Sequence, residues 1–74
     1  MKIEAFLKEL QDELEFESIK IELKTILKDC DEWDSMTALV LMAYASSNFD
    51  INLNAKDIEE IGTVESLAKK LGLL

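Results

Sequence analysis

Ser35 is the residue of this sequence whose type and position are best suited to chemistry. It follows Asp34, a good N-cap residue, where a long loop leads into an apolar run at residues 36–49. A helix that begins here presents unpaired N–H groups and the positive end of its dipole, which together stabilise an attached phosphate. Because the Asp34 carboxylate can accept from the N–H of Thr37, the Ser35 hydroxyl is free to be modified. Serine is common at helix starts, so its position alone also fits a purely structural residue.

The other reactive residue types argue against catalysis and metal binding. The chain has no histidine, which removes the commonest general acid–base and the usual partner of a serine or cysteine nucleophile. Cys30 is the only cysteine, and its acidic neighbours should raise the pKa of its thiol. Asp29, Asp31 and Asp34 faintly resemble a calcium loop, but Asp34 stands where that loop needs glycine and Val40 where it needs glutamate. We expect no catalytic residue, no metal site and no enzyme activity.

Ahead of Ser35, the hydrophobic pattern predicts one helix and then a long loop. Residues 2–14 place apolar side chains three or four positions apart, as on one face of a helix. Residues 15–34 lack that period; part of this segment alternates like a strand, but there is no second strand to pair with it. We therefore expect an extended, partly buried loop, and loops this long are usually functional or flexible. The side chains expected to anchor it are Ile19, Ile21, Leu23, Ile26 and Leu27.

After Ser35, the pattern predicts three further helices. The run at residues 36–49 is long enough for about four turns and rich in helix formers. Asn54 can cap a short helix at residues 55–61, and Thr63 can cap a last helix at residues 64–71.

The composition agrees with an all-α domain. The 74 residues allow one domain, which we place at residues 1–74. Hydrophobic residues make up 49% of the chain, and with no proline and two glycines little interrupts its helices. The predicted fold is a small bundle of three longer helices plus one short helix, with a long loop between the first two.

The net charge of the chain limits the classes of partner that it is expected to bind. Sixteen acidic and eight basic residues give a net charge of −8, which repels nucleic acid and anionic membranes and favours a partner with a basic face. The simpler interpretation of this charge is solubility. The longest apolar run, residues 38–45, is far shorter than the ~20 residues that a bilayer requires. We expect a cytoplasmic monomer with no nucleic-acid partner and no membrane insertion.

Residues 23–71 resemble the acyl carrier protein family, the phosphopantetheine-binding carrier domains. Asp34-Ser35-Met36 looks like the Asp-Ser-Leu attachment motif of that family, preceded by Trp33 as in many members. The resemblance continues through the apolar run at 36–49, Phe49-Asp50-Ile51, the Ile58 and Ile61 pair, and Thr63-Val64. An isolated Asp-Ser dipeptide has no value as a motif, but in this order of helices it is fairly specific.

The resemblance implies a carrier rather than a catalyst. A separate phosphopantetheinyl transferase would attach 4′-phosphopantetheine from coenzyme A to Ser35, and the thiol of this flexible arm would hold acyl groups as thioesters. The implied partners are that transferase and the acyl-loading and acyl-using enzymes. Two alternatives remain open: an aminoacyl or peptidyl carrier, and an unmodified helical protein-interaction module in which Ser35 is structural.

The sequence departs from the family pattern after the serine. Met36 replaces the usual leucine, which is a nearly isosteric change. Fatty-acid carriers bear a row of acidic residues on the following helix, whereas residues 36–49 contain no charge. This difference favours a specialised biosynthetic pathway over housekeeping fatty-acid synthesis.

The uncharged helix suggests a partner surface recognised by apolar contact. Met36, Val40 and Tyr44 have an i, i+4, i+8 spacing, and we expect them to face outward unless the stripe is itself part of the core. The residues on the other side, expected in the core, are Ala38, Leu39, Met42, Ala45 and Phe49. The residues expected to contact partners are Asp34, Met36, Thr37, Val40 and Tyr44.

Overall fold

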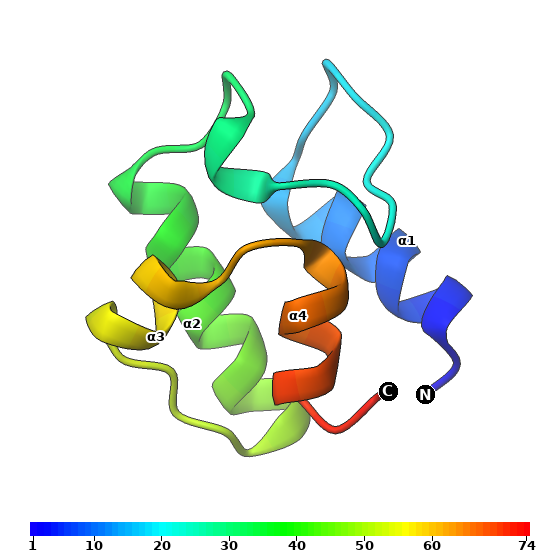
Figure 1. Cartoon of the computed structure of the whole chain (residues 1–74), viewed down its shortest axis with the longest axis vertical. Helices are drawn as coiled ribbons and strands as arrows, with labels where there is room; N and C mark the ends of the chain where they lie inside the picture. Colours follow the sequence, from blue (N-terminus) through cyan, green and yellow to red (C-terminus); the bar gives the residue numbers. More distant parts are fainter.

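Four α-helices and one 3₁₀ turn form the fold, and the computed structural model describes all 74 residues (Figure 1). The elements in chain order are α1 (Ile3–Leu14), η1 (Leu27–Asp29), α2 (Ser35–Phe49), α3 (Ala55–Glu60) and α4 (Val64–Lys70). The all-α prediction is confirmed, and every predicted helix end lies within one residue of the observed end. The prediction had three longer helices and one short one, but α4, with seven residues, is only one residue longer than the short helix α3. None of the helices has the length and apolar character needed to cross a membrane.

Both long helices end on a residue in the left-handed conformation. Glu15 follows α1 with a φ of 56°, and Asp50 follows α2 with a φ of 54°. A short polar side chain such as that of Asp50 tolerates this conformation, whereas a glutamate has no such compensation. Glu15 is therefore a strained start to the loop that leads toward Ser35.

The long loop, residues 15–34, runs across the ends of the helices (Figure 1). Buried side chains and backbone hydrogen bonds hold it to them. The expected anchors Ile21 and Leu27 are buried, and Leu23 is half-buried. The expectation is wrong for Ile19 and Ile26, which are 38% and 41% exposed. Phe16, 3% exposed, is an anchor that the sequence analysis did not identify. Ile19 and Ile21 would share one face of a regular extended segment, but the chain bends at Ser18 and Ile19, so Ile21 is buried while Ile19 stays exposed.

Backbone groups of the loop are also bonded to α4. The N–H of Val64 donates to the Thr25 carbonyl and that of Glu65 donates to the Leu23 carbonyl, both at 2.8 Å. These are donors that the start of a helix leaves unpaired. The loop thus completes the N-terminus of α4, next to the cap that Thr63 provides by accepting from the N–H of Ser66.

Helix α2 packs against α1, and the face that it exposes differs in part from the predicted one. Its buried residues are Thr37, Leu41, Tyr44 and Ala45. The prediction that Tyr44 faces outward is wrong, because this side chain is 4% exposed. The prediction that Leu39 belongs to the core is also wrong, because it is 58% exposed. An i, i+4, i+8 row winds about 80° around a helix, so its third member turns away from the face of the first.

The burial of Tyr44 is stabilised by an aromatic cluster and a hydrogen bond. Its ring lies 6.3 Å from that of Phe6 and 5.7 Å from that of Phe49, measured between centroids. The Tyr44 hydroxyl donates to Glu9 Oε1 at 3.0 Å. Burial, and then this bond to Glu9, raise the pKa of Tyr44. The hydroxyl therefore remains a donor at neutral pH.

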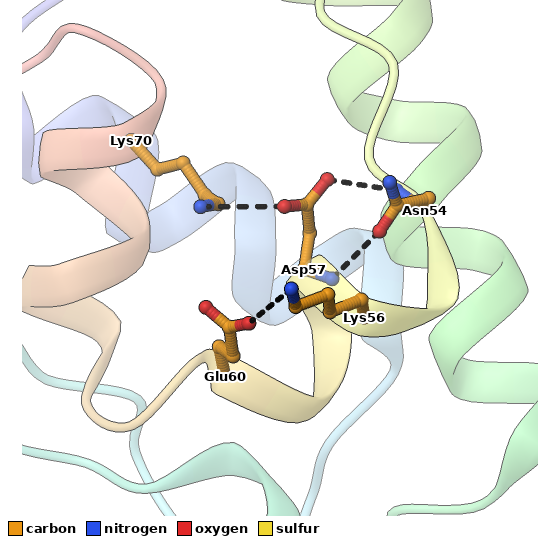
Figure 2. Close-up of polar contacts among 5 residues, drawn as sticks. All are labelled: Asn54, Lys56, Asp57, Glu60 and Lys70. Carbon is orange, nitrogen blue, oxygen red and sulfur yellow. Dashed lines mark hydrogen bonds and ion pairs between the residues drawn. The ribbon is translucent and has the colours of Figure 1, made fainter.

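Helix α3 is capped by near neighbours in the sequence, and one ion pair joins it to α4 (Figure 2). The side chain of Asn54 accepts from the N–H of Asp57 at 2.8 Å, and the Asp57 carboxylate accepts from the N–H of Asn54 at 3.0 Å. Lys70 of α4 lies 3.5 Å from the same carboxylate. The bond from Asn54, followed by the charge of Lys70, lowers the pKa of Asp57. The exposed pair Lys56–Glu60, 3.9 Å apart, adds little.

Candidate functional site

Ser35 is the first residue of α2, and its side chain is exposed. The cap of the helix is made by Asp34, whose Oδ1 accepts from the N–H of Thr37 at 2.8 Å and lies 2.9 Å from the Thr37 hydroxyl. The N–H and then the hydroxyl of Thr37 lower the pKa of Asp34. The predicted cap is confirmed, and it leaves the Ser35 hydroxyl available at a helix start where an attached phosphate would be stabilised.

Thr37 does not lie on a partner surface, contrary to the sequence-based expectation. Its side chain is 8% exposed and lies within hydrogen-bond distance of two acceptors before the serine. These are Asp34 Oδ1, at 2.9 Å, and the Glu32 carbonyl, at 3.2 Å. One hydroxyl proton serves both acceptors in turn. Thr37 therefore folds residues 32–34 back onto the first turn of α2, and its role is inside the domain.

Glu32 ties the start of the long loop to the segment before Ser35. Its Oε2 accepts from the N–H of Glu17 at 2.7 Å and from the N–H of Ser18 at 2.9 Å, and its Oε1 accepts from the Ser18 hydroxyl. We call this set of contacts the Glu32 clamp. The Ser18 hydroxyl and then the two N–H groups lower the pKa of Glu32 to about 2. No local pattern reveals the clamp, because its partners lie 14 and 15 residues away in the chain.

The exposed surface of α2 beside Ser35 is apolar. Met36 is 66% exposed and Leu39 is 58% exposed, while Val40 is half-buried. Of the predicted outward stripe, Met36 and Val40 lie on this surface and Tyr44 does not. Leu39, which the sequence analysis assigned to the core, takes its place. We call Met36, Leu39 and Val40 the outer face of α2.

Acidic residues border the site on its loop side. Asp29, Asp31 and Asp34 are exposed there. Cys30, between them, is half-buried; its burial, and then the charges of Glu32, Asp29 and Asp31, raise the pKa of its thiol, as predicted. The structure contains no group of three or more acidic or cysteine side chains arranged to hold a metal ion.

Two open hollows occur in the molecule, and Ser35 lines neither. A groove of about 1030 Å³ lies between α1 and the loop at residues 17–24, with Leu7, Ile19 and Leu23 among its apolar lining. A smaller hollow of about 280 Å³ lies between Glu13 at the end of α1 and the α2 side chains Val40 and Tyr44.

No protein-family model, curated protein or solved structure matches this chain.

Proposed function

We propose that this chain is a carrier protein modified on Ser35 with 4′-phosphopantetheine. The observation that carries the proposal is the exposed hydroxyl of Ser35 at the first position of α2, with the cap supplied by its neighbour Asp34. Within Asp34-Ser35-Met36, this geometry suits the attachment motif that the sequence resembles. The residues fit the group, because nothing in the cap needs the serine oxygen and the first turn of a helix favours a phosphodiester there.

A separate phosphopantetheinyl transferase would carry out the modification. The Ser35 oxygen attacks the phosphorus of the pantetheine phosphate in coenzyme A, and a new O–P bond forms. The P–O bond to the nucleotide half of coenzyme A breaks, and that half leaves with the electron pair. A base of the transferase takes the hydroxyl proton, since the chain has no histidine to do so.

Once bound, the arm supplies a thiol on which acyl or aminoacyl cargo is held as a thioester. The chain itself contributes a rigid attachment point and a docking surface. In this proposal the outer face of α2 contacts acyl-loading and acyl-using enzymes through Met36, Leu39 and Val40. The absence of charge on α2 supports a specialised pathway, and the cytoplasm is its proposed compartment.

The intact mass of the protein tests this proposal. Co-expression with a promiscuous phosphopantetheinyl transferase should add one phosphopantetheinyl group to the wild-type chain and none to Ser35→Ala. The variant should stay folded, because Asp34 rather than Ser35 caps α2. An unchanged wild-type mass, under conditions in which a known carrier is fully modified, would leave the unmodified interaction module as the better interpretation.

A further inference from the structure

The segment just before Ser35 is not helical, yet it is fixed from two sides. From the inside, the Thr37 hydroxyl lies 3.2 Å from the Glu32 carbonyl. From the outside, the Glu32 carboxylate accepts three hydrogen bonds from Glu17 and Ser18. These contacts restrain the backbone that leads into the serine.

The far end of the Glu32 clamp is itself anchored. Phe16, directly before the clamped residues, is buried. The side-chain amide of Gln11 on α1 donates to the carbonyls of Phe16, at 2.5 Å, and of Ile19, at 3.0 Å. A continuous series of contacts thus joins α1 to the first turn of α2 through Gln11, Glu32 and Thr37. The series ends two residues beyond Ser35.

The clamp has more partners than an ordinary surface contact. Hydrogen bonds to a charged acceptor are shorter and roughly twice as strong as those between neutral groups. Three donors converge on one carboxylate here, and two of them are backbone N–H groups that carry no side-chain entropy. By contrast, Asp31, the neighbouring acidic residue, is exposed. Removal of the Glu32 carboxylate should therefore release the clamp, whereas removal of the Asp31 carboxylate should leave it in place.

We propose that Glu32 is a positioning residue for Ser35, which holds the serine in the orientation that the transferase requires; this inference rests on the proposed function. Transfer to the hydroxyl needs the oxygen in line with the phosphorus, and a misplacement of about 1 Å can cost roughly 100-fold in rate. Loss of the clamp frees residues 31–34, so the serine samples orientations that dock but do not react. The effect should appear in kcat rather than in KM.

The kinetics of phosphopantetheine transfer test this inference, with coenzyme A and one transferase at a temperature where all variants are folded. Glu32→Ala should lower kcat about tenfold with KM little changed. Asp31→Ala is the matched control: it removes the same charge without touching the clamp, so it should leave kcat unchanged and alter only KM. Glu32→Gln keeps an oxygen for the N–H groups of Glu17 and Ser18, and it should retain most of the wild-type kcat.

The outcomes separate the two proposals. A wild-type chain that is not modified at all overturns the proposed function and this inference with it. A modified wild type whose kcat is unaffected by Glu32→Ala overturns the positioning role alone. An equal loss of kcat in Asp31→Ala or Glu32→Gln would mean that charge, not geometry, matters at residue 32. If Glu32→Ala fails to fold, Ser18→Ala removes one of the three donors from the opposite side and should give a smaller decrease in kcat.

Discussion

The two flanks of α2 are stabilised in different ways. On the side before Ser35, residues 15–34 contain only a single 3₁₀ turn, and they are held by side chains that reach across the chain. On the other side, residues 54–70 form two short helices whose caps join residues three positions apart. The first flank depends on distant side chains such as Gln11 and Glu32, whereas the second combines caps between near neighbours with backbone bonds from the start of α4 to the loop.

Because of this difference, the two flanks should affect the site in different ways. A local cap stabilises the helix that it starts, and its loss destabilises that helix. A long-range clamp fixes one segment relative to another, so its loss changes the position of whatever lies between. Ser35 lies directly after the segment held by long-range contacts, which makes that flank the one on which its orientation depends.

The largest expected effect comes from removing the buried anchor of the first flank. Phe16→Ala should destabilise the domain by about 3–5 kcal/mol, because it leaves a cavity where a nearly fully buried ring was packed. Ile19→Ala, three residues further along and 38% exposed, is the control and should cost less than about 1 kcal/mol. Urea unfolding followed by circular dichroism measures both. Equal losses in the two variants would show that the loop is not anchored as described.

A smaller effect is expected for the polar anchor of the same flank. Gln11→Ala should cost about 1–3 kcal/mol, because it leaves two carbonyls and the N–H of Ile21 without their partner. Asp12→Ala, an exposed substitution on the same helix, should change the free energy of unfolding by no more than about 0.5 kcal/mol. Hydrogen exchange at Ile21 should also speed up in Gln11→Ala. Unchanged protection there would contradict the assignment.

On the second flank, loss of one cap should cost less. Asn54→Ala removes the acceptor of the Asp57 N–H and should destabilise the domain by about 1 kcal/mol. The exposed Asn52 in the preceding connector provides the control, and Asn52→Ala should be close to neutral. Thermal unfolding of both variants measures these changes in stability. A cost for Asn54→Ala as large as that of Phe16→Ala would erase the distinction between the flanks.

The smallest expected effect is a difference in acid sensitivity. The Glu32 pKa is about 2 in the folded chain against an ordinary 4.5, so its contribution is present above pH 4.5 and is lost as the pH falls toward 2. The stability difference between wild type and Glu32→Gln should therefore shrink over that interval. Asp57→Asn on the second flank should behave in the same direction, since the pKa of Asp57 is also lowered. The test is a series of urea unfolding curves from pH 6 to pH 2. A difference that stays constant with pH would show that the Glu32 carboxylate has no preferred partners.

The sequence by itself determined the helices and their limits. Asp34, Asn54 and Thr63 each cap a helix through an N–H three residues away, and the structure contains all three caps. Such contacts depend only on the backbone of one turn, so residue type and spacing are enough to predict them. The same local logic placed Ser35, exposed, at the start of a long helix.

Only the tertiary structure decided which face of α2 is buried and how the segment before Ser35 is held. Residues 35–49 carry no charge, so their sequence does not mark a solvent side. The contacts of Tyr44 with Phe6 and Glu9 on α1 settle the rotation instead, which buries Tyr44 and exposes Leu39. The Glu32 clamp joins residues 14 and 15 positions apart, a distance over which residue types impose no geometry until the chain has folded.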